Sequence, residues 1–364
     1  MVNSNQTTRI FYLDNMRVFC MIFGVYYHAV AFGEYGLFED IIRLSTVFRM
    51  EAFFLVSGFF AALVAKKRTT SVFLKHRARS LLIPFCATLV LINPITIYLT
   101  LGFYNNLAFS SYSLGDAYTN LMSNRHGGPE LHLWFLLVLM VYIILFIVFR
   151  PSVKSLAAWC DDNTNSPFIA PVAFAFLYAS YMALFNFSTR AISYPRLVFP
   201  FVEDLPYFIV GALAAYSGTV LARTGKISLP LLAIGGFGFA LSLFYRGPGW
   251  GTAWVFGRGL LSVCLVVILI WLFRTFFDRQ TSLSRLMTNS IYTVYLFHPV
   301  FLISIVSVFG IRANDLGLVA LLILATVVVA LSVVFHIRVI QRIPALSFLF
   351  AGNFARLPVP TGDQ

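Results

Sequence analysis

Charged residues are scarce in this chain of 364 residues. Asp, Glu, Lys and Arg together make up 11% of it, whereas soluble domains carry about 25%. Hydrophobic residues make up 59%. Such a composition cannot cover a water-facing surface. It excludes a soluble globular protein and predicts a single integral-membrane domain over residues 1–364.

Cysteine is scarce too, and the spacing of the cysteines indicates neither a metal site nor a disulfide framework. No pair has the close spacing of a zinc site or of a disulfide framework, so we expect no metal. Walker loops, zincin motifs and a Ser-His-Asp order are also missing. Three of the four cysteines fall inside apolar spans, and all four are interpreted as small core residues: Cys20, Cys86, Cys160 and Cys264.

Acidic residues are fewer than basic ones, which leaves a net charge of +12. In a soluble protein this balance could indicate nucleic-acid binding. Here no basic helix or aromatic platform lies outside the apolar runs, so we expect no nucleic acid among the partners. Basic residues that keep loops in the cytoplasm explain the charge.

Long apolar runs dominate what is present. A helix needs about 20 mostly apolar residues to cross a bilayer. Ten stretches qualify, and the seventh and eighth are the weakest because only the turn Arg246-Gly247-Pro248-Gly249 separates them. The sequence therefore predicts an all-α polytopic membrane protein with about ten transmembrane helices. Their approximate limits are 16–33, 46–65, 80–101, 131–149, 167–187, 205–221, 229–245, 252–273, 288–309 and 316–337.

The distribution of Lys and Arg predicts the orientation. With a cytoplasmic N-terminus, 18 of the 26 Lys and Arg residues fall on the cytoplasmic side. We therefore expect both termini in the cytoplasm and a multi-pass protein of the inner (cytoplasmic) membrane. The longest external segment, from about Gly102 to Glu130, is polar and could cover an external opening. As an alternative, Ala29-Val30-Ala31 resembles a signal-peptidase site, and cleavage there would remove His28.

The first span holds the sharpest set of candidates, because ionisable residues inside a bilayer are costly and usually functional. Arg17 and His28 are eleven residues apart, so both lie on one helix face, about 16 Å apart along the axis. Asp14 precedes Arg17 by three residues and can pair with it. We predict a functional stripe. The alternative is a His28 that only hydrogen-bonds to a neighbouring helix.

The second span begins with two charged residues near its external end. Arg49 and Glu51 lie there, and Ser57 and Gly58 lie in the middle of the span. We expect Arg49, Glu51 and Ser57 to line an acceptor site or channel, although Arg49 could equally be an interface anchor. Gly58 is expected to allow close helix contact.

A basic run, KHRARS, precedes the third span. Arg and Lys bind phosphate groups well, so Arg77 and Arg79 predict a cationic site for phosphates. The alternative is that the run only fixes the topology of the loop.

Further histidines lie at later spans. His132 begins the fourth span beside Trp134, an aromatic residue typical of the membrane interface, and His298 lies within the ninth, directly before a proline. We take His132, Trp134 and His298 as candidates for an acceptor site or channel. His76 and His336 lie near cytoplasmic ends and are interpreted as solvated.

Six segments spread from about Tyr12 to Gly352 carry a resemblance to a known family: YLDNMRVFCMIFGVYYHA, FRMEAFFLVSGFF, HLWFLLVLM, LPYFIVGALA, NSIYTVYLFHPV and RIPALSFLFAG. In this order and spacing they resemble the integral-membrane acyltransferases of acyltransferase family 3. The resemblance is strongest to a group associated with succinylation of osmoregulated periplasmic glucans. It implies transfer of an acyl group from cytoplasmic acyl-CoA to a carbohydrate across the membrane.

The resemblance also implies roles for residues. Family members carry an Arg and a catalytic His with ten residues between them, which Arg17 and His28 match. They also carry two Arg residues, with two residues between them, just before the third span. Arg77 matches the first, but the second position is Ser80, and the adjacent Arg79 is the candidate to replace it at the CoA phosphates. Acyl-CoA would be a co-substrate rather than a bound cofactor.

The first functional hypothesis is that the protein is an O-acyltransferase. A neutral His28 takes the proton from a sugar hydroxyl as it attacks the thioester, while Asp14 and Arg17 order the cytoplasmic part of the channel. An acyl-His intermediate is an alternative route. A transporter or flippase for a polar solute or glycan is the alternative function. A purely structural protein would leave the polar stripe unexplained. The sequence leaves the acyl group, the acceptor and the oligomeric state open.

Overall fold

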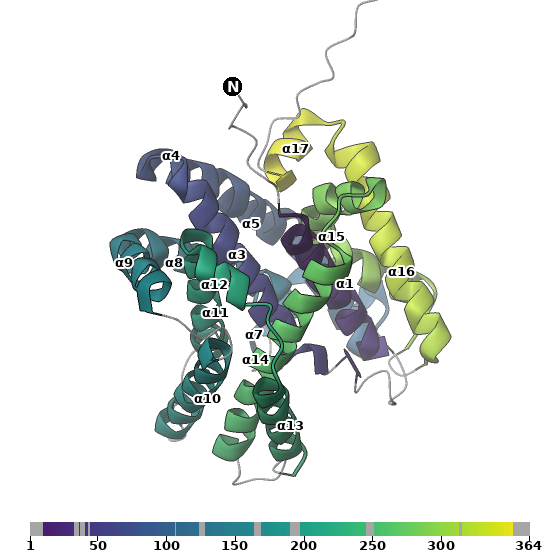
Figure 1. Ribbon diagram of the computed structural model, residues 1–364. Helices are drawn as coiled ribbons and strands as arrows, with labels where there is room; N and C mark the ends of the chain where they lie inside the picture. The colour runs from purple at the N-terminus through teal and green to yellow at the C-terminus, as the bar shows by residue number, and fades with distance from the viewer. Residues whose placement is uncertain are drawn as a thin grey trace, which may run out of the picture. The chain divides into compact units, whose positions relative to one another are not determined.

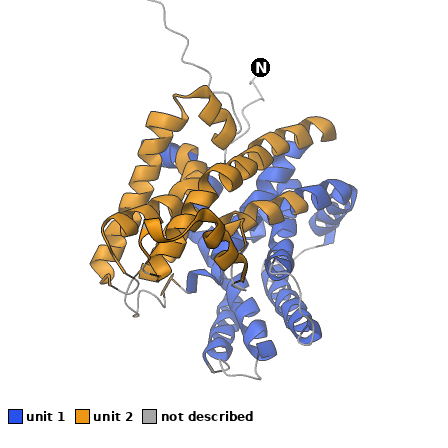
Figure 2. Ribbon diagram, turned by 180° about the vertical axis from the view of Figure 1, so that it is seen from behind, with its two compact units in different colours: residues 1–20, 44–67, 142–288 blue, residues 21–43, 68–141, 289–364 orange. Residues whose placement is uncertain are grey.

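All regular structure in the computed structural model is helical within the described residues (Figure 1). The prediction of an all-α polytopic membrane protein is confirmed. The chain forms two compact units, each assembled from three segments of the sequence (Figure 2). The described residues are 10–32, 36, 41–42, 44–105, 107–123, 128–163, 169–189, 197–244, 251–312 and 315–351.

Unit 1 contains residues 1–20, 44–67 and 142–288. Three helices belong in part to each unit: α1 (Phe11–Ala29), α8 (Trp134–Val148) and α15 (Ser282–Val308). The helices wholly within unit 1 are α3 (Arg49–Lys66), α9 (Arg150–Asn163), α10 (Ile169–Thr189), α11 (Val198–Tyr216), α12 (Gly218–Arg223), α13 (Leu229–Phe244) and α14 (Gly251–Phe276).

The most extensive helix contact in unit 1 joins α3 and α11. A Cβ atom added at Gly58 of α3 would overlap the carbonyl oxygen of Phe208, and one added at Gly211 of α11 would overlap the carbonyl oxygen of Leu55. Only glycine lets the two backbones approach this closely, which is the packing that small residues permit in membranes. The expectation that Gly58 allows close helix contact is confirmed.

Helix α14 packs against both α10 and α13 within unit 1. Small residues again make the contact possible, since a Cβ at Gly259 would lie 2.8 Å from the Cα of Ala179 on α10, and one at Gly257 would lie 2.6 Å from the Cβ of Leu241 on α13. As a result, α14 is the most buried of the candidate membrane spans, with 67% of its most apolar window inside the protein.

Unit 2 contains residues 21–43, 68–141 and 289–364. Its third span is one continuous helical run of 36 residues, Thr70–Asn105, which is longer at both ends than the predicted 80–101. The elements wholly within unit 2 are η1 (Val30–Phe32), α4 (Thr70–Arg77), η2 (Ala78–Leu82), α5 (Ile83–Ala87), η3 (Thr88–Ile92), α6 (Asn93–Asn105), η4 (Phe109–Ser111), α7 (Leu114–Ser123), η5 (Leu131–Leu133), α16 (Leu318–Phe335), η6 (His336–Ile340) and α17 (Pro344–Ala351).

Part of the polar segment predicted at 102–130 folds back onto α6. Its helix α7 packs against α6, and Ala117 of α7 forms a small core with Ile97 and Leu101 of α6. Whether this segment covers an external opening stays a prediction.

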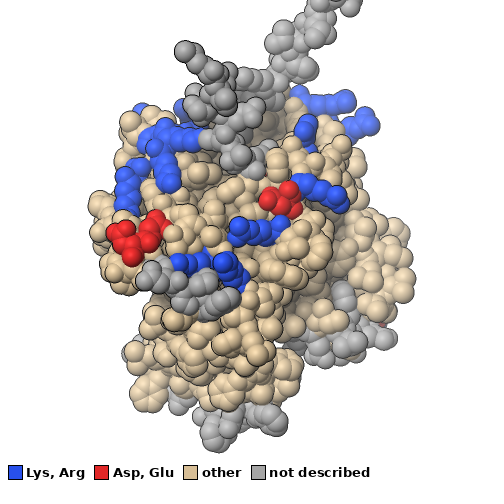
Figure 3. All heavy atoms as spheres, viewed as in Figure 1, with Lys and Arg blue, Asp and Glu red and all other residues tan. Residues whose placement is uncertain are grey.

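The exposed face of α16 carries apolar side chains, whereas the exposed face of a helix in a soluble protein carries mostly polar ones. Val319, Ile323, Val327 and Val334 are exposed and recur at helical spacing, so they form one apolar stripe. Exposed apolar surface of this kind marks contact with a membrane. Most of the surface visible in Figure 3 is likewise uncharged.

Each of the ten predicted stretches contains a helix, and within the described residues seven helices are long and apolar enough to cross a bilayer. Helices α1 and α3 carry polar and charged residues, and α13 has only 16 residues. The count of ten spans and the cytoplasmic termini therefore stay predictions. The seven are Thr70–Asn105, Leu131–Val148, Ile169–Thr189, Val198–Tyr216, Gly251–Phe276, Ser282–Val308 and Leu318–Ile340.

The predicted limits of the sixth span, 205–221, were wrong at both ends. Helix α11 begins at Val198, because the acidic pair Glu203 and Asp204 is packed against protein rather than marking the interface. The helix ends at Tyr216, because Ser217 adopts an extended backbone and its hydroxyl accepts from Val220 N–H to cap α12.

Candidate functional site

The first candidate set lies on α1. Within unit 1, Arg17 Nη2 donates to Asp14 Oδ1 at 3.4 Å, so the predicted pairing is confirmed. The start of this helix is fixed to the chain after α14, since Tyr12 N–H donates to the Asp278 carboxylate at 3.1 Å. His28 lies on the part of α1 that belongs to unit 2. A common functional stripe with Arg17 therefore stays a prediction from helix geometry.

Three predicted histidines meet in unit 2. The ring centroid of His298 lies 5.2 Å from that of His28 and 5.4 Å from that of His132, so the three imidazoles form a row with His298 in the middle. We call these residues the histidine row. His132 and His298 are only 9% and 4% exposed, whereas His28 is exposed. His28 is therefore the member of the row that lies at the protein surface.

The local sequence fixes the tautomer of His298. Pro299 has no N–H, so the carbonyl of Tyr295 loses its usual helical hydrogen bond. The Nδ1 atom of His298 lies 2.9 Å from that oxygen and 3.0 Å from the carbonyl oxygen of Val294. Because both partners only accept, Nδ1 must carry the proton. In neutral His298 the lone pair is therefore on Nε2.

The segment that carries His132 is held from two sides. Asn93 donates to the Pro129 carbonyl at 2.8 Å, and Tyr295 donates to the His132 carbonyl at 2.8 Å. Between these anchors, Leu131 has a φ of +46°, a conformation that bulky residues rarely adopt. Such backbone strain persists only where the surroundings enforce it, and it concentrates at functional sites.

The ring of His132 is held by aromatic edges. Its centroid lies 5.3 Å from that of Tyr295, and neither ring nitrogen makes a hydrogen bond of normal geometry to the described part of the chain. Trp134 follows as the first residue of α8, half-buried and in ring contact with Phe135. Three imidazole rings, each able to donate and to accept a hydrogen bond, thus lie in contact through His298. Within the described residues, no group of His, Cys, Asp and Glu is arranged as a metal site.

The basic run lies elsewhere in unit 2. Arg77 ends α4, is half-buried and stacks over the Phe73 ring at 5.4 Å, while Arg79 lies in the following π turn and is exposed. Ser80, which occupies the family's second Arg position, donates to the Arg77 carbonyl at 3.3 Å. The serine thus supports the turn, and Arg79 is the more accessible cation.

A second polar cluster is buried in unit 1. Glu51, in the first turn of α3, is 1% exposed, and Asp204 of α11 is 2% exposed. Glu51 interacts electrostatically with Glu203, Arg258 and the neighbouring Arg49. One oxygen of Glu51 and one of Asp204 have no hydrogen-bond partner in the described part of the chain. We call Arg49, Glu51, Glu203, Asp204 and Arg258 the carboxylate cluster.

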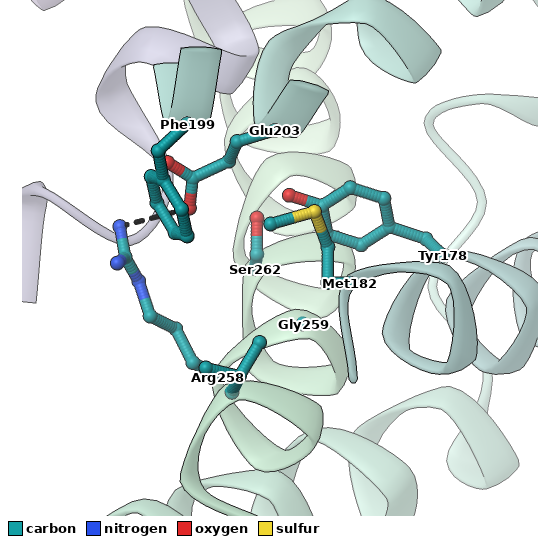
Figure 4. Close-up of a pocket in the computed structure, with 8 residues that line it drawn as sticks. Tyr178, Met182, Phe199, Glu203, Arg258, Gly259 and Ser262 are labelled. Atoms are coloured by element: carbon teal, nitrogen blue, oxygen red, sulfur yellow. Dashed lines mark ion pairs between the residues drawn. The ribbon is translucent and has the colours of Figure 1, made fainter. Parts of the chain in front are cut away.

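The cluster contains an ion pair between Arg258 and Glu203, drawn as a dashed line in Figure 4. Arg258 of α14 donates from Nη2 to Glu203 Oε1 at 3.1 Å and to the Thr46 carbonyl at 2.9 Å. Beside it, a small pocket is lined by Tyr178 and Ser262, among others. Ser57, predicted to join this set, lies half-buried in the middle of α3, and nothing in the structure assigns it a role.

Several of these residues were missed in the sequence. Arg258 lies seven residues inside α14, and an intramembrane arginine is a functional candidate by default, so the signal was present. Glu203 and Asp204 were placed outside the sixth span. His336 was interpreted as solvated, which was wrong. It is 5% exposed, because its ring hydrogen-bonds the Thr293 hydroxyl at 2.7 Å.

The fold and the two ionisable clusters define a polytopic membrane protein with polar and charged side chains among its apolar helices. The chain belongs to acyltransferase family 3, whose acyltransferase domain matches residues 10–337. The resemblance noted in the sequence is confirmed.

Curated relatives match along nearly the whole chain. The glucans biosynthesis protein C of Escherichia coli (strain SMS-3-5 / SECEC) is 26% identical over 395 residues, covering 97% of both chains. The protein of the same name from Shigella dysenteriae serotype 1 (strain Sd197) is 26% identical over 394 residues, again covering 97% of both. No solved structure matches the chain.

Proposed function

We propose that this membrane acyltransferase moves an acyl group from cytoplasmic acyl-CoA to a hydroxyl of a periplasmic or surface carbohydrate, with His28 as general base. The name of the relatives supports a glucan as acceptor, and the resemblance to that group makes succinyl the first acyl group to test. The observation that carries the proposal is the histidine row, in which the exposed His28 lies against the buried His298.

In the proposed reaction, neutral His28 takes the proton of the sugar hydroxyl while its oxygen attacks the thioester carbonyl. The new O–C bond replaces the C–S bond, and the proton passes from His28 to the departing CoA sulfur. Neighbouring imidazolium rings repel, so His28 can hold the proton only while His298 and His132 stay neutral. The Nδ1–H of His298 is already committed to backbone carbonyls, which keeps its ring in place.

The donor would bind at the basic run. Arg77 and Arg79 are the candidates for the CoA phosphates, because guanidinium groups pair with phosphate oxygens in a two-pronged geometry. Asp14 and Arg17 would order the channel on the same side of the bilayer. The protein would act in the inner membrane, with acyl-CoA and the carbohydrate as its partners.

The first test measures acyl transfer by the purified protein in liposomes, with succinyl-CoA and a periplasmic glucan, followed by mass spectrometry of the glucan. His28→Ala and His28→Gln should both lower kcat by about 10²–10⁴-fold, which is what a general base contributes, and should leave acyl-CoA affinity unchanged. The matched control is His336→Gln, which alters a structural histidine and should transfer normally. Near-normal transfer by His28→Gln would remove this residue from the mechanism and favour a transporter.

A second arm of the test separates donor binding from chemistry. Arg77→Glu and Arg79→Glu should weaken acyl-CoA binding in calorimetry, because each reverses a charge that would face phosphates. Arg285→Glu, an exposed arginine at the start of α15, serves as the control. Unchanged CoA affinity in both test variants would reduce the run to a topology signal.

A further inference from the structure

A second cavity in unit 1 belongs to neither cluster. It has a volume of about 210 Å³, and its walls are almost entirely apolar side chains of α10, α11 and α14, including Phe174, Val210, Leu213 and Val266. A dry apolar cavity of about 150 Å³ is already large enough to bind benzene. A cavity of this size and lining therefore takes a hydrocarbon rather than water.

The cavity runs along the helices rather than across them. One end lies at Tyr207, whose hydroxyl hydrogen-bonds Ser262 at 2.7 Å, and the walls continue to Leu213 on α11 and Ile270 on α14. Six residues of helix rise about 9 Å. The cavity is thus an elongated slot, which suits part of an extended alkyl chain.

The other end of the slot is cationic. Arg223 of α12 lines it, and Gly225 packs against Ile270, which places α12 at this end. From α14, Arg274 Nη1 donates to the Ala222 carbonyl at 3.4 Å, and Lys226 follows in the chain. Arg223 therefore lies where the apolar walls stop, with Arg274 reaching the same short helix and Lys226 three residues further along the chain.

The acidic residues nearby offset only part of this charge. Asp161 of α9 interacts with Arg223, and its carboxylate also accepts hydrogen bonds from the Ser217 hydroxyl and from the Thr219 N–H. Arg223, Lys226 and Arg274 outnumber the two carboxylates, Asp161 and Asp162, by one positive charge. Asp162 is exposed. In the predicted topology this end faces the cytoplasm, where basic pockets between membrane helices bind acidic lipid head groups.

We propose that this slot binds one acyl chain of an anionic phospholipid, with the lipid phosphate beside Arg223. The apolar length accepts the chain, and Arg223 at its end matches the head-group phosphate, with Arg274 and Lys226 adding positive charge to the same region. The proposal does not depend on the acyl-transfer reaction, because none of these residues is assigned to the histidine row or to the basic run.

The test compares phosphatidylglycerol and phosphatidylcholine with the same acyl chains, added to the delipidated full-length protein and followed by native mass spectrometry. We expect a retained phosphatidylglycerol adduct, weakened about tenfold or more by Arg223→Gln. Ala170→Leu and Val266→Phe, which fill the slot from two different helices, should each abolish it. Leu177→Phe, on the exposed face of α10, is the matched control and should bind normally. Two filling variants guard against one that fails to fold.

A native cysteine gives an independent readout. Cys160 lines the cationic end of the slot, and burial followed by the neighbouring Asp161 raises the pKa of its thiol. In a Cys86→Ser background, which removes the exposed cysteine, maleimide labelling of Cys160 above neutral pH should slow when phosphatidylglycerol is present. The slowing should vanish in Ala170→Leu.

Three results would overturn the proposal. Equal retention of both phospholipids would remove the head-group argument. Unchanged binding in both filling variants would place the lipid elsewhere. Protection of Cys160 by a long-chain acyl-CoA but not by phosphatidylglycerol would assign the slot to the acyl donor instead.

Discussion

At the scale of single residues, the ion pair between Arg258 and Glu203 allows a test of whether the carboxylate cluster stabilises the fold. Breaking a mostly buried pair leaves one charge without its partner, which costs about 3–5 kcal/mol. We therefore expect Arg258→Gln to lower the free energy of unfolding by about that amount, measured by denaturation of the purified protein in detergent. The carboxylate cluster would then be held together chiefly by this guanidinium.

A double variant provides the control for this prediction. Adding Glu203→Gln to Arg258→Gln removes the unpaired charge, so part of the lost stability should return. If the double variant is no more stable than Arg258→Gln, the ion pair does not stabilise the protein, and other interactions hold the carboxylate cluster together.

Asp161 gives a pH-dependent prediction outside the membrane spans. Hydrogen bonds from Ser217 and then Thr219 lower the pKa of this carboxyl below its ordinary value. Its stabilisation is therefore complete above the unfolded pKa of about 3.9 and is lost as the pH falls through the lower folded pKa. We expect Asp161→Asn to lower the melting temperature at neutral pH and to match the wild type in strong acid.

The neighbouring Asp162→Asn is the matched control, since Asp162 is exposed. Melting curves collected across the acid range would test both variants. A deficit of Asp161→Asn that persists at the lowest pH would contradict the assigned cause.

At the scale of helices, the contact between α3 and α11 depends on two glycines. Gly58→Ala would place a methyl group against the Phe208 carbonyl, and overpacking of this kind costs about 1–3 kcal/mol. We expect a lower melting temperature. Gly236→Ala on α13 is the control, because nothing lies within 4 Å of an added Cβ there. Since alanine is the better helix former, the control should be neutral or slightly stabilising. Equal stability of the two variants would mean that the helices can separate at no cost.

Helices were predictable from the sequence because apolar runs are a local signal, and each of the ten runs holds a helix. The start of α11 was not predictable from the sequence, since Glu203 is typical of a loop until Arg258, 55 positions later, is known to pair with it. Of the candidate site, His28, His132 and His298 were identified singly as polar residues in spans. Their meeting in one row required the tertiary contacts of α1, η5 and α15. His336 was misread because Thr293, which hydrogen-bonds it, is 43 residues away in the chain.

At the scale of the whole molecule, the ten-span topology predicts on which side of the membrane the chain before and after α13 lies. Helix α13 has 16 residues and would rise about 24 Å, less than a bilayer core of about 30 Å. A cysteine at Gly249, which lies outside the described residues, should react with an impermeant thiol reagent from the periplasmic side in a background without native cysteines. A cysteine at Ser228 should not react. The reverse pattern would contradict the ten-span arrangement.

The close packing of α3 and α11 also has a consequence for how the protein is made. About 130 residues separate Lys66 from Val198, so at roughly 5–20 residues per second α3 leaves the ribosome some 7–26 s before its partner. During that interval Arg49 and Glu51 lack Glu203 and Arg258, and charged groups alone in lipid are costly. Helix α3 should therefore stay beside the insertion machinery until α11 emerges, and the order of synthesis makes this early helix one of the last to settle.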